Sequence, residues 1–210
     1  MSDLLQLSAA RLRPSPPKPD EVEMRFSPRA VAELESILTH YPDKKSAILP
    51  ALWIAQREYG GHLTPGALSE VAVRLNRPFA EIEGVATFYS MYEFHPIGKH
   101  LIEVCTCLTC HQKGAYRILD YLKQKLGIDL GGTTEDGMFS LKEVECLNAC
   151  DRAPLLQVGS SYCGPMDEAK IDALLADLRK KEESSVLQLA NDIVQCHLTA
   201  PERKEVSEVG

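Results

Sequence analysis

Four of the seven cysteines fall into two closely spaced pairs, and this spacing constrains the chain more than any other feature. Cys105 and Cys110 enclose four residues, whereas Cys146 and Cys150 enclose three. Each pair begins where a β-strand is predicted to end, so two loops should bring four thiolates to one edge of a sheet. Four thiolate sulfurs suit either a [2Fe–2S] cluster or a tetrahedral zinc ion.

Spacing alone leaves several interpretations open. Structural zinc sites use cysteine pairs separated by two to four residues, and both pairs fall within that range. The cysteines could also be buried structural thiols. The C-x-x-C motif at 107–110 resembles a dithiol oxidoreductase motif, but that role leaves the other three paired cysteines unused. We expect Cys107 to be a spare thiol, Cys163 a buried small side chain and Cys196 a surface thiol.

Composition and charge exclude some classes of function. The chain has 210 residues, with 30 acidic and 23 basic side chains and a net charge of −7, which argues against a nucleic-acid partner. No stretch approaches the ~20 apolar residues of a membrane span, and the N-terminus lacks the apolar run of a secretory signal. We therefore expect a cytoplasmic protein, where cysteines bind metals more often than they form disulfides.

The chain divides into four segments. Proline and mixed charge predict a flexible arm over 1–26. Helical spacing of apolar residues predicts a helical domain of four short helices over 27–95. The order strand–helix–strand–strand–strand–helix predicts a small α/β domain over 96–182, which makes the fold class α+β. We expect 183–210 to be a tail that is either disordered or ordered only on a partner.

Local signals set the predicted element bounds. Ser27-Pro28 and Thr64-Pro65 are helix-start pairs. The helices are predicted at 28–40, 44–59, 65–75, from 78, 114–126 and 168–179, and the strands at 100–105, 139–146, 155–158 and near 162. Pro50 should kink the second helix or move its start to a later residue.

Two stretches make the sequence recognisable. EGVATFYSMYEFHPIGKHLIEVCTCLTCHQKGA and VECLNACDRAP closely resemble the E subunit of NADH:quinone oxidoreductase, respiratory complex I. That family has a helical N-terminal domain followed by a thioredoxin-like [2Fe–2S] ferredoxin domain. The resemblance covers about 27–180, and its C-x₄-C…C-x₃-C signature is highly specific. It implies that one [2Fe–2S] cluster is held by Cys105, Cys110, Cys146 and Cys150.

The resemblance also implies a function and partners. The chain would be an electron-transfer subunit on the cytoplasmic side of the inner membrane, held there by the complex. FMN and NADH would bind the adjacent F subunit, with further peripheral-arm subunits nearby. The sequence has no G-x-G-x-x-G or Walker motif, so this chain alone offers no complete active site. NAD-reducing hydrogenase and NAD-dependent formate dehydrogenase use the same module and are alternatives. A zinc-stabilised interaction module is the alternative from another class.

Two residues depart from the family pattern. Cys107 stands where the family usually has another residue, and it offers an alternative ligand. Asn148 stands where glycine is common, but asparagine tolerates left-handed backbone, so the loop should keep its shape. The aromatic residues between 88 and 94 are expected to form a core between the two domains, with a docking face for the flavin subunit as the alternative.

Overall fold

The computed structural model describes residues 22–199. Within them, the α-helices are α2 (Pro28–Thr39), α3 (Ile48–Glu58), α4 (Pro65–Leu75), α5 (Phe79–Phe88), α6 (Leu108–Gln112), α7 (Ala115–Leu126), α8 (Glu168–Leu178) and α9 (Ser185–Leu198). The strands are β1 (His100–Cys105), β2 (Phe139–Val144), β3 (Leu156–Val158) and β4 (Ser161–Cys163). This mixture of helices and a small sheet confirms the predicted α+β class. None of the helices in this part of the chain is both long and apolar enough to cross a membrane.

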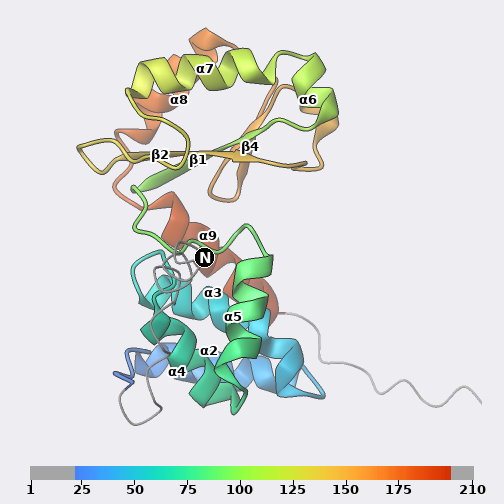
Figure 1. Ribbon diagram of the computed structural model, residues 1–210, viewed down its shortest axis with the longest axis vertical. Helices are drawn as coiled ribbons and strands as arrows, with labels where there is room; N and C mark the ends of the chain where they lie inside the picture. The colour runs from blue at the N-terminus through green and yellow to red at the C-terminus, as the bar shows by residue number, and fades with distance from the viewer. Residues whose placement is uncertain (1–21, 200–210) are drawn as a thin grey trace, which may run out of the picture.

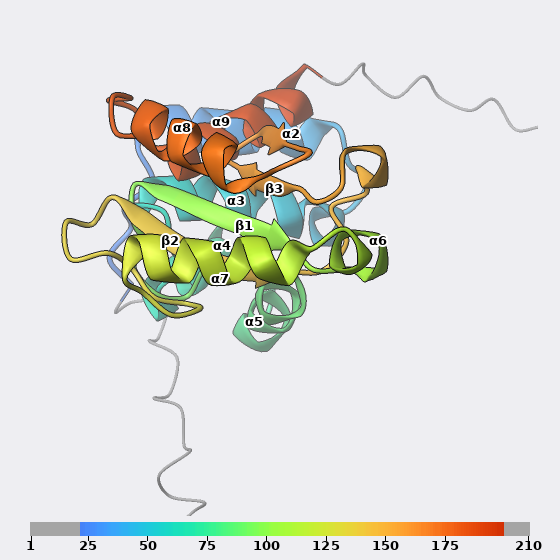
Figure 2. The ribbon, with the colours of Figure 1, turned by 90° about the horizontal axis from the view of Figure 1, so that it is seen from above.

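Two parts are stacked along the long axis of the molecule (Figure 1). The helical part contains α2 to α5 and α9, and the sheet part contains the four strands with α6, α7 and α8. Helices α7 and α8 lie on one face of the sheet, and the helical part lies beyond the other face (Figure 2). Each part has its own cluster of buried apolar side chains. The exact residues at which one predicted domain ends and the next begins stay a prediction.

Capping residues explain where the first helices begin. The Ser27 hydroxyl accepts a hydrogen bond from the Ala30 amide, and the Thr64 hydroxyl accepts one from Ala67, each beside a proline in the first turn. The predicted helix at 44–59 is divided into a short 3₁₀ helix, η2 (Lys44–Ala47), and α3. Pro50 therefore lies in the first turn of α3, where its missing N–H leaves no hydrogen bond unmade.

The sheet has the strand order β2-β1-β3-β4. Strands β1 and β2 are parallel, with Cys105 opposite Val144, whereas β3 and β4 add antiparallel strands on the other side of β1. Parallel pairing places the carboxyl ends of β1 and β2 at the same edge of the sheet. Because β2 ends at Val144, two residues earlier than predicted, Cys146 lies on the following loop.

The prediction of a tail at 183–210 is wrong for its first half. Residues 185–198 form α9, which begins at the N-cap Ser184. Ala190 and Val194 are fully buried among the side chains of the helical part, where α9 packs along α3 and α2. Ala190 and Val194 are four residues apart, a spacing typical of one face of a helix. The spacing does not show that α3 buries this face. Residues 200–210 lie outside the described part.

The prediction of a flexible arm at 1–26 is wrong for its last residues. Phe26 is buried in the helical part, and Glu70 accepts hydrogen bonds from the backbone amides of Arg25 (2.8 Å) and Phe26 (3.0 Å). Glu70 is itself fully buried and accepts further hydrogen bonds from Tyr59 and Arg74. A buried carboxylate with this many donors holds the segment before α2 in place. Residues 1–21 lie outside the described part.

His100 lies where the two parts are joined. The Lys99 carbonyl accepts hydrogen bonds from the Ser185 amide (3.1 Å) and the Ser184 hydroxyl (3.0 Å), which ties the start of α9 to β1. The next residue, His100, is fully buried, and neither ring nitrogen has a hydrogen-bond partner within the described residues. Burial lowers the pKa of His100, and the charges of Lys99 and Lys181 lower it further, against a smaller opposing effect of the Leu178 backbone.

This burial predicts a loss of stability in mild acid. The folded pKa of His100 lies below the ordinary value of 6.5, so the unfolded chain takes up the proton first. Above pH 6.5 the protein keeps its full stability, because His100 is neutral in both the folded and the unfolded state. As the pH falls from 6.5 to the folded pKa, the free energy of unfolding decreases by about 1.4 kcal/mol for each pH unit. Urea unfolding between pH 8 and 5 should show this loss, and His100→Leu should reduce it. Replacing the exposed His95 by leucine is the control, and parallel pH profiles for all three proteins would contradict the prediction.

Candidate iron–sulfur site

The first cysteine pair lies in a buried apolar environment. Cys105 is the last residue of β1, and its amide donates a hydrogen bond to the Leu155 carbonyl (3.1 Å). The chain then turns into α6, a short helix that the sequence analysis missed, and Cys110 lies within it. Both cysteines are 1% exposed and pack with Ala115 and Leu155. The protein interior therefore shields Cys105 and Cys110 from water.

The second pair is exposed: Cys146 lies on the loop after β2, and Cys150 is the first residue of a short 3₁₀ helix, η3 (Cys150–Arg152). Asn148, between the two cysteines, has a φ of 57°, the left-handed conformation that the sequence analysis expected it to tolerate. Its amide donates a hydrogen bond to the Cys146 sulfur (3.4 Å). Leu147 and Ala149 pack against the buried cluster around the first pair, so the two loops are held against each other.

Electrostatic effects show that the four thiols are neighbours. Burial raises the pKa of Cys110 to about 11, the Leu155 backbone opposes this shift, and contact with Cys105 adds to it. Contact with Cys146 is the main cause of the raised pKa of Cys150. Cys110 also senses the charge of Cys150, and Cys150 senses the charge of Cys105. The structure therefore brings the four predicted cysteines together, while their role as ligands stays a prediction.

The arrangement in pairs fits a two-iron group. Within each pair one cysteine raises the pKa of the other, Cys105 that of Cys110 and Cys146 that of Cys150. A tetrahedral zinc ion needs its four sulfurs around one centre, whereas a [2Fe–2S] cluster takes two thiolates on each iron. Four cysteine thiols, two from each loop, therefore form a donor set that fits a [2Fe–2S] cluster.

The remaining cysteines lie in three different places, and all are free thiols. Cys107 is half-buried against the cluster around the first pair. Cys163, expected to be buried, is only half-buried on β4, where burial still raises its pKa. Cys196 is exposed, as expected, but it lies on α9 and not on a disordered tail.

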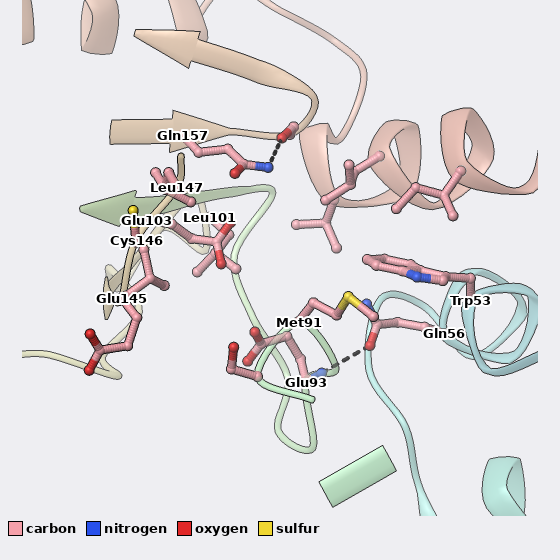
Figure 3. Close-up of a pocket in the computed structure, with 16 residues that line it drawn as sticks. Trp53, Gln56, Met91, Glu93, Leu101, Glu103, Glu145, Cys146, Leu147 and Gln157 are labelled. Carbon is pink, nitrogen blue, oxygen red and sulfur yellow. Dashed lines mark hydrogen bonds between the residues drawn. The ribbon is translucent and has the colours of Figure 1, made fainter. Parts of the chain in front are cut away.

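A cavity of about 270 Å³ lies between the sheet and the helical part, next to the cysteine site. Figure 3 shows Cys146 toward one end of the cavity and Trp53 toward the other. Glu103 also lines it, and burial raises the pKa of that carboxyl against the opposing charge of Lys142. Lys142 forms an ion pair with Glu93, which joins β2 to the segment before β1. No sequence pattern indicates these charged residues, because only the fold brings them together.

The aromatic residues between 88 and 94 do not form one cluster. Tyr92 is buried in the helical part, where its ring lies 5.4 Å from that of Trp53, and Phe94 packs against the same core. Phe88 is 80% exposed, and its ring contacts that of Tyr89. Tyr92 and Phe94 therefore belong to the core of the helical part, whereas Phe88 and Tyr89 are exposed, so these residues do not form the predicted core between the two domains.

Comparisons with known proteins agree with this geometry. Residues 34–179 match the model of the thioredoxin-like [2Fe–2S] ferredoxin family. The NADH-quinone oxidoreductase E subunit 2 of Rhizobium meliloti is 42% identical over 75% of this chain and 94% of its own length. The NADH-quinone oxidoreductase E subunit of Rickettsia prowazekii is 43% identical over 67% of this chain and 81% of its own length.

One solved structure extends the comparison to the fold. A chain of an NAD⁺-reducing [NiFe]-hydrogenase in the air-oxidised state aligns with 62% of this chain at a TM-score of 0.53 and 25% identity. The aligned region spans only 23% of the hydrogenase chain. With the curated relatives aligned over most of their length, and the four cysteines on two adjacent loops, the chain belongs to the thioredoxin-like [2Fe–2S] ferredoxin family, among the E subunits of NADH-quinone oxidoreductase.

Proposed function

We propose that this chain is an electron-transfer subunit of NADH:quinone oxidoreductase, attached through the complex to the cytoplasmic side of the inner membrane. A [2Fe–2S] cluster held by the four paired cysteines would supply single-electron exchange with FMN on the adjacent NADH-binding F subunit. The observation that carries the proposal is the convergence of the two cysteine loops in a chain 42% identical to an E subunit over nearly all of that relative.

The difference in burial between the two pairs supports an electron-transfer role. Cys105 and Cys110 are buried among apolar side chains, which keeps water away from one side of the site. Cys146 and Cys150 are exposed, so the other side is open to an approaching protein. Burial, solvent access and hydrogen bonds to sulfur are the means by which a protein sets the reduction potential of a cluster.

Exposed apolar side chains near the site support docking on a partner. Leu108 is 70% exposed and lies on α6 between the two cysteines of the first loop. Tyr116, 44% exposed at the start of α7, donates a hydrogen bond from its hydroxyl to the Glu143 carboxylate on β2. Apolar side chains exposed beside a functional site commonly mark a protein interface. The sequence has no nucleotide-binding motif, so the partner would supply the FMN and NADH sites.

A second candidate is the same module in an NAD-reducing hydrogenase or an NAD-dependent formate dehydrogenase. The aligned chain of the NAD⁺-reducing [NiFe]-hydrogenase supports the first of these. Because this chain spans only 23% of that hydrogenase chain but 94% of the Rhizobium E subunit, the separate subunit of the quinone oxidoreductase is the better match.

Metal analysis tests the site. Anaerobically purified protein should contain two iron and two acid-labile sulfide per chain, the stoichiometry of one [2Fe–2S] cluster. Cys110→Ser, Cys146→Ser and Cys150→Ser should each lose most of the iron, because each removes one of four ligands. Cys163→Ser, on β4, is the matched control and should stay loaded. A colourless protein with one zinc per chain would point to the interaction module instead.

Reduction by NADH tests the electron-transfer role. Dithionite should produce the rhombic EPR signal of a reduced cluster in the isolated chain, whereas NADH alone should not, because the chain lacks a hydride acceptor. Adding the FMN-containing partner subunit should make NADH effective. An isolated chain that NADH reduces by itself, or a complex that NADH fails to reduce, would contradict this role.

Asn148 offers a test of the loop. The left-handed backbone costs a residue with a Cβ about 1–2 kcal/mol, and more when the side chain is branched at Cβ. Asn148→Gly should therefore keep the loop and its iron, whereas Asn148→Val should strain the loop and weaken the hydrogen bond to Cys146. The measurement is the rate of iron loss to a chelator. Equal rates in the glycine and valine variants would show that the loop tolerates either backbone shape.

A further inference from the structure

Glu143 on β2 links three segments near the cysteine site. One oxygen of its carboxylate, Oε1, accepts hydrogen bonds from the Thr106 hydroxyl (2.7 Å) and the Tyr116 hydroxyl (3.1 Å). Thr106 directly follows Cys105, and Tyr116 is the second residue of α7. Hydrogen bonds to an ionised acceptor are roughly twice as strong as those between neutral groups. A single side chain therefore connects the end of β1 and the start of α7 to the strand that leads to Cys146.

Two further contacts involve the same segments. The Thr106 amide donates a hydrogen bond to the Val144 carbonyl (3.1 Å), so the pairing of the strands continues one residue beyond the end of β1. The ring of Tyr116 packs edge-to-face on that of His111, with 5.1 Å between their centroids. His111 directly follows Cys110 on α6. The first cysteine loop is thus held at its start through Thr106 and at its end through Tyr116.

The loop held by these contacts encloses two buried thiols. Cys105 and Cys110 are each 1% exposed, whereas Glu143 lies at the surface. A reagent or a chelator can reach the buried sulfurs only when the loop opens. Local opening costs less free energy than global unfolding and depends on the few contacts that the moving segment makes. The hydrogen bonds to Glu143 are such contacts, so they should control access to the thiols.

We propose that Glu143 is a positioning residue that keeps the first cysteine loop closed over Cys105 and Cys110. Its hydrogen bonds go to Thr106 and Tyr116, so it acts on the thiols through these two neighbours. The closure is a property of the chain itself. Its effect on iron retention rests on the proposed function, and the two effects can be measured separately.

Thiol labelling tests the closure in the absence of iron. Reduced, iron-free full chains are treated with iodoacetamide, and mass spectrometry follows the modification of Cys110. Glu143→Ala should raise the labelling rate about tenfold, because it removes two hydrogen bonds to a charged acceptor. Glu143→Gln keeps an oxygen acceptor, so its rate should stay within about threefold of wild type. Cys163, half-buried on β4, is the internal control and should be labelled at the same rate in every variant.

A double-mutant cycle tests whether Glu143 and Tyr116 act together. Tyr116→Phe removes one hydrogen bond and keeps the ring contact with His111, so it should speed the labelling about threefold. Glu143→Ala already lacks this hydrogen bond, so adding Tyr116→Phe to it should have no further effect. Glu135→Ala and Tyr162→Phe are the matched controls, since both residues are exposed and neither side chain makes a hydrogen bond within residues 22–199.

The same variants test the site with iron present. In anaerobically purified chains, Glu143→Ala should lose iron to a chelator about tenfold faster than wild type, an effect typical of losing a residue that orients a ligand. Glu143→Gln should restore the slow loss. The free energy of global unfolding in urea should change little in both variants, because Glu143 lies at the surface. A role in overall stability alone would not separate the two variants in this way.

Each result bears on a separate claim. Equal labelling of Cys110 in wild type and Glu143→Ala overturns the positioning role, and so does a Glu143→Gln variant that is labelled as fast as Glu143→Ala. Further acceleration in the double variant also overturns it, because Glu143 and Tyr116 would then act independently. Faster labelling of Cys163 together with Cys110 would show a general loss of structure and count against the role. A wild type without iron and sulfide overturns the proposed function alone, since the labelling requires no cluster.

Discussion

The parallel pairing of β1 with β2 is the constraint on which the site depends. It directs the carboxyl ends of both strands to one edge of the sheet, where each continues into a cysteine loop. A register shift of one residue would move Cys105 to the opposite face and separate the pairs. Packing of α7 and α8 on the buried side chains of β1 holds this register. The position of four sulfurs is thus set by apolar burial in the core of the sheet part.

Local signals in the sequence predicted most of the elements. The caps at Ser27 and Thr64 and the alternation before Cys105 are short-range features that act through the backbone of their own segment. The paired cysteines were also recognisable from spacing and resemblance, and the structure places them together. From the residues alone, the role of these cysteines stayed open among a [2Fe–2S] cluster, a zinc ion and buried structural thiols.

The features that were missed depend on contacts between distant segments. The apolar face of α9 is buried by helices more than a hundred residues earlier, so local composition made it look like a tail. Glu70 on α4 is fully buried and accepts hydrogen bonds from the backbone before α2, a contact that no local pattern indicates. The ion pair between Glu93 and Lys142 likewise needs the sheet to form first. Sequence patterns describe a segment's own periodicity, but not which segment will cover it.

The path of α9 has a consequence for the mechanics of the molecule. The chain enters the sheet part after α5 and returns to the helical part through α9, so two covalent connections run between them. A single connection can act as a swivel, whereas two connections anchored side by side at Lys99 and Ser185 permit far less twisting. The two cysteine loops are thereby held at a restricted orientation to the helices. Such rigidity suits the proposed electron-transfer role, in which the distance between the site and a partner would have to stay constant.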